Sequence, residues 1–249
     1  MESLITPSGA PSSRRDFFKR ASLSAGVLAS AAALQACDSE DNGTGDGVVL
    51  NFSNDFGVLN YAYALEQLEA AFYARVISDT AFTTTFSATA GAGGTPSEQQ
   101  TFRDIAVHEN IHAAFLKSAL GTNAIGNLTP DFSAVNFASK ASVLGTALTF
   151  EDLGVAAYNG AGKYLTDPGL LTIAGKIVSV EARHASAIRD MILNNARSGA
   201  TIGESGASGI PEVVGANGLD RAFEPAAVLA AADPFIMEMI SVTGIPMAT

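Results

Sequence analysis

Two copies of one short pattern constrain this chain more than any other feature. Glu109-x-x-His112 is followed 72 residues later by Glu181-x-x-His184, and the two copies use two of the three histidines in the chain. Residues at positions i and i+3 of a helix share one face, so each copy can present a carboxylate and an imidazole together. Each copy is also preceded by a glutamate inside an apolar stretch. Four glutamates and two histidines form the ligand set with which a four-helix bundle holds two metal ions.

Apolar residues recur with the helical period in four segments, and these predict an all-α fold. We expect helices at Phe56–Ile77, Ser97–Leu120, Phe137–Leu165 and Gly169–Ala196. The short join between the third and fourth helices predicts antiparallel neighbours. The join between the second and third covers about fifteen residues and can span ~50 Å at ~3.3 Å per residue. A helix of about 25 residues is only ~37 Å long, so a long crossover between two helical hairpins is feasible.

The two preceding glutamates, Glu66 and Glu151, lie on the apolar stripes of their helices. In the third segment, for example, Leu144, Leu148 and Val155 share the stripe of Glu151. An ionised carboxylate stays in an apolar interior only when it is paired or bound to a metal. Glu109 and Glu181 lie on the apolar stripes of their own helices too. Four such acids call for a shared counter-charge, which two metal ions supply. Imidazole combined with carboxylate suits Fe, Mn or Zn better than Ca or Mg, and we expect Fe first, with Mn or Zn as alternatives.

The predicted metal ligands are therefore Glu66, Glu109, His112, Glu151, Glu181 and His184. Glu69 lies three residues after Glu66, and we keep it as an alternative or additional ligand. Tyr73 follows Glu66 by seven residues, and Tyr158 follows Glu151 by the same distance. Seven residues are about two helical turns, so each tyrosine shares its glutamate's face and can hydrogen-bond a ligand carboxylate. Two ordinary core aromatics would give the same spacing.

The N-terminal stretch differs from the rest of the chain. Residues 13–19, Ser-Arg-Arg-Asp-Phe-Phe-Lys, resemble a twin-arginine export signal, and the apolar run 21–34 that follows is short for a membrane span. Leu34-Gln35-Ala36-Cys37 resembles a lipoprotein cleavage box and ends in the only cysteine of the chain. We therefore expect lipidation at Cys37, with a cleaved leader or an uncleaved anchor as the alternatives.

Four regions follow from these signals: a leader with its lipobox (1–37), a flexible linker (38–55), the helical bundle (56–197), and a loop with one or two short C-terminal helices (198–249). The part after the leader holds 10 basic and 23 acidic residues. This charge makes nucleic acid an improbable partner. We expect the membrane as a partner through the lipid anchor, and we consider a homodimer. The sequence does not identify a redox partner.

The ligand pattern on four helices resembles the ferritin-like superfamily. Leu59-Asn60-Tyr61-Ala62 and the following Leu65-Glu66-Gln67-Leu68-Glu69-Ala70-Ala71-Phe72-Tyr73 resemble the ferritin-like-domain proteins that include the desiccation-related type. The resemblance covers the four helices and, more weakly, the tail. It implies a ferritin-like four-helix bundle with a two-metal centre, a long crossover from the second to the third helix, and short C-terminal helices.

Three functions are compatible with these observations. The first is an exported dimetal oxidase or peroxide-scavenging enzyme, linked to oxidative or desiccation stress and located outside the cytoplasm. The second is a non-catalytic protective or structural bundle that its metals stabilise. The third is a zinc metalloprotease, because His108-Glu109-Asn110-Ile111-His112 matches the H-E-x-x-H helix motif. The protease hypothesis leaves the other three glutamates unexplained, and outside it His108 is expected to be a capping residue or a partner of a ligand.

Overall fold

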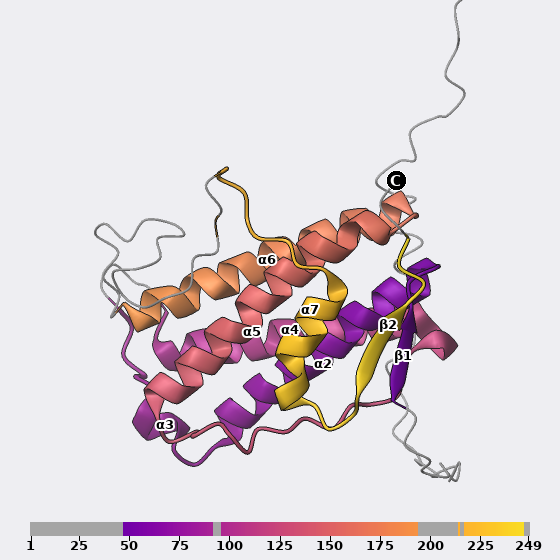
Figure 1. The fold of residues 1–249 in the computed structure, drawn as a ribbon. Coiled ribbons are helices and arrows are strands. Elements are labelled where there is room, and N and C mark those ends of the chain that lie inside the picture. The colour runs from indigo at the N-terminus through magenta and orange to yellow at the C-terminus, as the bar shows by residue number, and fades with distance from the viewer. Residues whose placement is uncertain (1–46, 92–95, 194–213, 215–216, 247–249) are drawn as a thin grey trace, which may run out of the picture. The chain divides into compact units, whose positions relative to one another are not determined.

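The computed structural model describes residues 47–91, 96–193, 214 and 217–246. Four long helices dominate this part of the chain (Figure 1): α2 (Asp55–Ser78), α4 (Glu98–Leu120), α5 (Lys140–Ala161) and α6 (Pro168–Ile192). Their number and type agree with the sequence prediction, and the all-α class is confirmed. The third predicted helix is shorter than expected, with a 3₁₀ turn (Gly162–Tyr164) at its end. The short helix α3 (Phe82–Thr85) forms between the first two predicted helices, where no helix was expected.

The helix starts are fixed by side-chain caps, which satisfy amide groups that have no partner within the helix. Asn54 caps α2, Ser97 caps α4, Ser139 caps α5 and Asp167 caps α6. Pro168 follows Asp167 at the first position of α6, where its missing N–H costs nothing. These local signals explain why the helix starts lie close to the predicted positions.

The helices pack as two hairpins, α2 with α4 and α5 with α6. Asn60 near the start of α2 donates a hydrogen bond to the carbonyl of Asn123, just beyond the end of α4, at 2.8 Å. This contact shows that α2 and α4 run antiparallel. The crossover between the hairpins runs along α2, where the backbone amides of Ile125 and Leu128 donate to Asn60 and Gln67. The expected long connection from the second to the third helix is therefore present.

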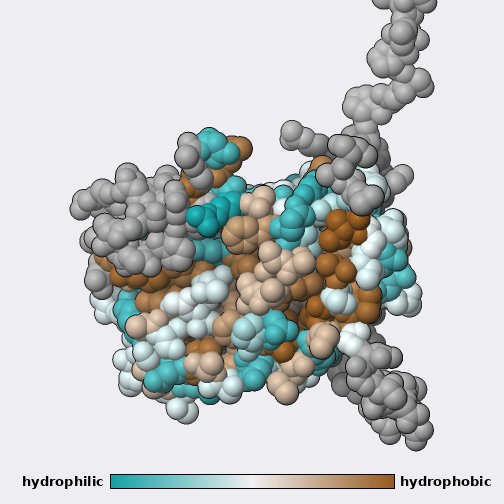
Figure 2. All heavy atoms as spheres, in the orientation of Figure 1, coloured by the Kyte–Doolittle hydropathy of each residue, from teal (hydrophilic) through white to brown (hydrophobic). Residues whose placement is uncertain are grey.

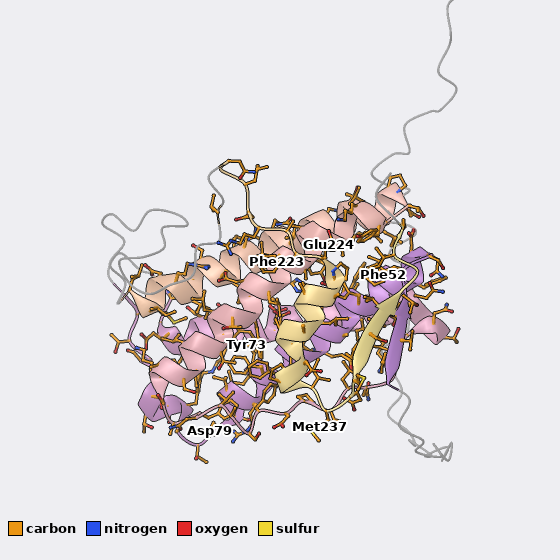
Figure 3. All side chains as sticks on the ribbon, viewed as in Figure 1. Phe52, Tyr73, Asp79, Phe223, Glu224 and Met237 are labelled. Carbon is orange, nitrogen blue, oxygen red and sulfur yellow. The ribbon has the colours of Figure 1, made fainter. Side chains whose placement is uncertain are left out.

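The C-terminal segment covers the bundle with α7 (Pro225–Ala232) and a 3₁₀ turn (Asp233–Phe235). Phe223, labelled in Figure 3, precedes α7, and its amide donates to the carbonyl of Ala156 on α5 at 3.0 Å. A Cβ atom on Gly160 would lie 1.8 Å from the carbonyl oxygen of Phe223, so only glycine permits this close approach. The surface over α7 is largely apolar (Figure 2).

Two short strands pair in parallel, β1 (Val48–Asn51) and β2 (Ile240–Thr243), with Val48 opposite Ile240. The end of the stretch predicted to be a flexible linker, residues 48–55, is therefore ordered instead. The reason is packing, because Leu50 and Phe52 are both only 1% exposed and belong to the core. The leader with Cys37, residues 38–46 of the linker and the end of the fourth predicted helix beyond 193 lie outside the described residues.

The core is rich in aromatic side chains that stack edge to face. The ring of Phe150 lies 5.1 Å from Phe72 and 4.8 Å from Phe235, which joins α5 to α2 and to the C-terminal turn. Such pairs contribute beyond their buried area, by about 0.5–1.5 kcal/mol each. Among the described residues, no helix is long and apolar enough to cross a membrane.

Candidate metal centre

The six predicted ligands meet in the middle of the bundle. The helix α2 contributes Glu66, and α5 contributes Glu151, whereas α4 and α6 each contribute one Glu-x-x-His pair. All four glutamates are completely buried, and both histidines are nearly so. The six side chains form two groups with the geometry of candidate metal positions.

The first group surrounds His112. Its Nδ1 atom lies 3.3 Å from Oε2 of Glu66, 3.2 Å from Oε2 of Glu109 and 3.1 Å from Oε1 of Glu181. Three carboxylate oxygens and one imidazole nitrogen therefore converge from three helices. This mixed set suits Fe, Mn or Zn.

The second group surrounds His184. Its Nδ1 atom lies 2.7 Å from Oε1 of Glu109 and 3.3 Å from Oε2 of Glu151, and Glu181 completes the group. Glu109 and Glu181 thus belong to both groups, and Glu109 directs one oxygen to each histidine. Glu66 and Glu151 each belong to one group. In a two-metal centre, Glu109 and Glu181 would be the bridging carboxylates, and Glu66 and Glu151 would be the terminal ones.

Several atoms in this centre lack a hydrogen-bond partner. They are Oε2 of Glu66, Oε1 of Glu109, Oε2 of Glu151, both carboxylate oxygens of Glu181, and Nδ1 of His184. The contact between His184 and Glu109 is short, yet its direction is wrong for a hydrogen bond, since Nδ1 of His184 is among these unpartnered atoms. Buried polar atoms without partners are costly, by about 1–3 kcal/mol each and more for charged groups. Atoms that converge without bonding one another fit metal ligands.

Electrostatics lead to the same conclusion. Burial, together with the charge of neighbouring carboxylates, raises the pKa of Glu66 and raises that of Glu181 to about 8. Burial also raises the pKa of Glu151 to about 7. Among the described residues, no lysine or arginine forms a salt bridge with any of the six. Two divalent cations would supply four positive charges and balance the four carboxylates.

The histidines take the place of these cations when no metal is bound. Burial disfavours their charged forms, but the surrounding carboxylates outweigh it and raise the pKa of His112 to about 12 and that of His184 to about 10. Burial would also raise the pKa of Glu109, but the two histidines beside it lower it to about 2. Metal binding needs neutral imidazoles, so it must displace these protons.

The two tyrosines hold the terminal carboxylates, in a crossed arrangement. Tyr73 on α2 donates to Oε1 of Glu151 on α5, and Tyr158 on α5 donates to Oε1 of Glu66 on α2 at 2.5 Å. Figure 3 labels Tyr73 within the bundle. The sequence spacing indicated a contact between tyrosine and ligand, but it did not reveal that each tyrosine reaches the other hairpin. Each bond leaves the second oxygen of its glutamate free for a metal.

Glu69 is buried beside the centre but belongs to neither group. Burial and the charges of Glu181 and Glu109 raise its pKa well above the usual value, which favours the neutral acid. Its Oε1 atom and Oε2 of Glu181 both lie 3.2 Å from the point where Gly154 would carry a Cβ. Gly154 therefore leaves room for both carboxylates, a role that the sequence reading missed.

His108 lies outside both groups and contacts the centre through His184. Its Nδ1 atom is 2.9 Å from Nε2 of His184, and the two rings are nearly parallel. His184 can therefore bind a metal through Nδ1 while His108 orients its other nitrogen. Among the residues that the structure describes, no candidate metal group contains both His108 and His112, as the zinc-protease hypothesis requires. His108 instead borders an open pocket of about 300 Å³ with a partly polar lining, which reaches His184.

Comparison with known proteins decides the family. A family model described as a ferritin-like domain matches residues 54–194. The chain belongs to the ferritin-like domain family. The match spans all four long helices and every residue of both candidate metal groups. No curated protein matches this chain. Buried carboxylate and histidine groups within a ferritin-like domain fit a dimetal-carboxylate protein.

Proposed function

We propose that this ferritin-like protein binds two metal ions, iron first and manganese or zinc as alternatives. Glu66 and Glu151 would bind one ion each, Glu109 and Glu181 would bridge the two, and each histidine would complete one position. The observation that carries the proposal is the sharing of both bridging glutamates between two groups that are otherwise separate. One ion alone would leave the glutamate and the histidine that belong only to the other group without a metal.

The proposed activity is an oxidase reaction that consumes dioxygen or peroxide. It would protect the cell against oxidative or desiccation stress. A pair of redox-active metals would supply the electrons for such a reaction. The chain's own part is to hold the ligands still and to keep water out. The fully buried carboxylates and the two tyrosine hydroxyl groups support this role. The tyrosines keep their protons, because burial and the nearby glutamates raise the pKa of both hydroxyl groups.

A non-catalytic role is the second candidate. The centre lies where the two hairpins meet, and each hairpin supplies two of the four glutamates and one of the two histidines. Metal ions bound there would join the hairpins and stabilise the bundle. A protective or structural protein of the cell envelope needs nothing more from its metals.

The location of the protein is part of the proposal. The twin-arginine pattern and Cys37 support export and lipid attachment, which would place the bundle outside the cytoplasm and tethered to a membrane. Val107, Ile111 and Phe115 form an exposed apolar stripe on α4, and this supports a homodimer. Loss of membrane association in Cys37→Ser, tested by cell fractionation, would support the anchor, whereas unchanged association would contradict it.

Metal analysis of the purified protein tests the centre. We expect about two Fe or Mn ions per chain, as the ligand set of such bundles implies. They should be lost in Glu66→Ala, Glu109→Ala, Glu151→Ala and Glu181→Ala but retained in the control Glu238→Ala, which lies away from the centre. One zinc ion that survives Glu151→Ala would refute the two-metal proposal and favour the protease.

Reactivity then separates the two remaining functions. The metal-loaded, reduced protein is mixed with dioxygen or with peroxide, and the consumption of each is followed. Consumption that Glu181→Ala abolishes would support the oxidase. Two bound metals without consumption of either would favour the structural role.

A further inference from the structure

An apolar cavity of about 20 Å³ lies between α2, α4, α5 and α6, away from the pocket that borders His108. Its wall is almost entirely carbon. Leu170 and Ile173 at the start of α6 line it and are partly exposed. A cavity needs roughly 10–15 Å³ of this kind of volume to hold one water molecule, so this one has room for a single small molecule.

The cavity lies one helical turn from the Glu66–His112 group. Ala62, Leu116 and Ile177 all line it. Each is four residues away from a member of that group: Glu66, His112 and Glu181, respectively. One turn of helix rises about 5.4 Å, so three helices place the cavity at the same short distance from the same candidate metal position.

Tyr158 connects the cavity to the centre directly. It belongs to the cavity wall, and its hydroxyl group donates to Glu66 at 2.5 Å. In the His184 group, only the shared Glu181 has a wall residue one helical turn away. His184 itself lines the partly polar pocket. The two candidate metal positions therefore have different surroundings, although their ligands are alike.

The wall determines what the cavity can hold. A buried water molecule needs two to four polar partners, and this wall offers almost none. Hydrogen peroxide and metal ions are excluded for the same reason, because each would lose its hydrogen bonds or its hydration. A small apolar molecule loses nothing on entry.

We propose that this cavity binds a small apolar gas of the size of dioxygen and supplies it to the Glu66–His112 side of the centre. The supply role rests on the proposed oxidase function, whereas gas binding in the cavity does not. The proposal also makes dioxygen, rather than peroxide, the oxidant that enters from this side.

Xenon tests the cavity itself, because it is apolar and needs no reaction. The signal of dissolved ¹²⁹Xe is recorded with the metal-free and the metal-loaded protein, and crystals under xenon pressure give its position. We expect xenon in the cavity in both forms. Ala174→Leu places a larger side chain in the wall and should abolish binding while leaving the metal content unchanged. Ala182→Leu, on the same helix and also partly buried but outside the cavity, is the matched control and should bind xenon normally.

Dioxygen consumption tests the supply role. The metal-loaded Ala174→Leu variant should consume dioxygen more slowly than the control variant, with an unchanged rate of peroxide consumption. Absence of xenon from the parent protein, or equal binding in Ala174→Leu, would refute the cavity site and leave the metal centre intact. Equal rates of dioxygen consumption would refute the supply role. A protein that binds xenon and two metals but consumes no dioxygen would refute the proposed oxidase, and with it the supply role.

Discussion

Gly154 offers a way to disturb the metal centre without removing a ligand. It lies on α5, buried against the carboxylates of Glu181 and Glu69, and a Cβ atom there would be 3.2 Å from one oxygen of each. Ordinary contacts of a Cβ atom begin at 3.4 Å. The two carboxylates must therefore retreat by a few tenths of an ångström in Gly154→Ala. Ligand distances in metal sites are held to within about 0.2 Å, so a shift of this size reaches the limit that the bridging position of Glu181 tolerates.

We expect Gly154→Ala to lower metal affinity by about 10–100-fold, the usual effect of disturbing the surroundings of a ligand. The matched control is Gly145→Ala on the same helix, where a Cβ atom would meet nothing within 4 Å. That control should gain about 0.5–1 kcal/mol of stability, because alanine favours a helix over glycine, and it should keep its metals. Competition with a coloured chelator measures affinity, and urea unfolding of the metal-free proteins measures stability.

The two variants must differ for the reasoning to hold. If Gly154→Ala binds two metals with the parent's affinity and gains as much stability as Gly145→Ala, the position of the Glu181 carboxylate does not matter for binding. Loss of metal from both variants would point instead to a general sensitivity of α5.

Further predictions concern the tyrosines, the histidines and the strand β1. Tyr73→Phe and Tyr158→Phe each remove a hydrogen bond to a buried carboxylate, worth about 1.5–3 kcal/mol, and should each weaken metal binding in a chelator titration; unchanged affinity would show that the rings only pack. Because the pKa of His112 is raised to about 12 and that of His184 to about 10, both carry a proton at neutral pH, so metal binding should release protons and weaken as the pH falls. Calorimetry in two buffers of different ionisation enthalpy measures that release, and a release of zero contradicts it. Leu50→Ala should cost about 2–5 kcal/mol in urea unfolding if β1 belongs to the core, and a negligible cost would place β1 outside it.

Much of the fold was accessible from the sequence because its signals are local. Helical periodicity lies within each helix, and the four predicted segments followed from it. The caps Ser97 and Asp167 stand directly before their helices and fix the starts that the periodicity indicated. The six candidate ligands could be predicted because an ionised glutamate on an apolar stripe needs a counter-charge. The structure brings all six together.

What the sequence did not reveal depends on contacts between distant residues. The strand β1 pairs with β2, which lies almost 200 residues later in the chain. Each strand has only four residues, too few for an alternating apolar pattern that would predict the pairing. The linker prediction was wrong at residues 48–55 for that reason. Likewise, the spacing of Tyr158 gives its helix face but not its partner, and the hydrogen bond to Glu66 crosses to the other hairpin. The space that Gly154 leaves for two carboxylates is visible only in three dimensions.

The crossed tyrosines have a consequence for how the protein acquires its metals. Each hairpin contains one terminal glutamate, one bridging glutamate and one histidine, but the tyrosine that steadies its terminal glutamate belongs to the other hairpin. A hairpin that forms first during synthesis therefore has half a ligand set and no means of holding its terminal carboxylate in place. If the protein binds two metals as proposed, capture of both ions must then wait until the second hairpin has docked, so the fold has to be complete before the full pair is loaded.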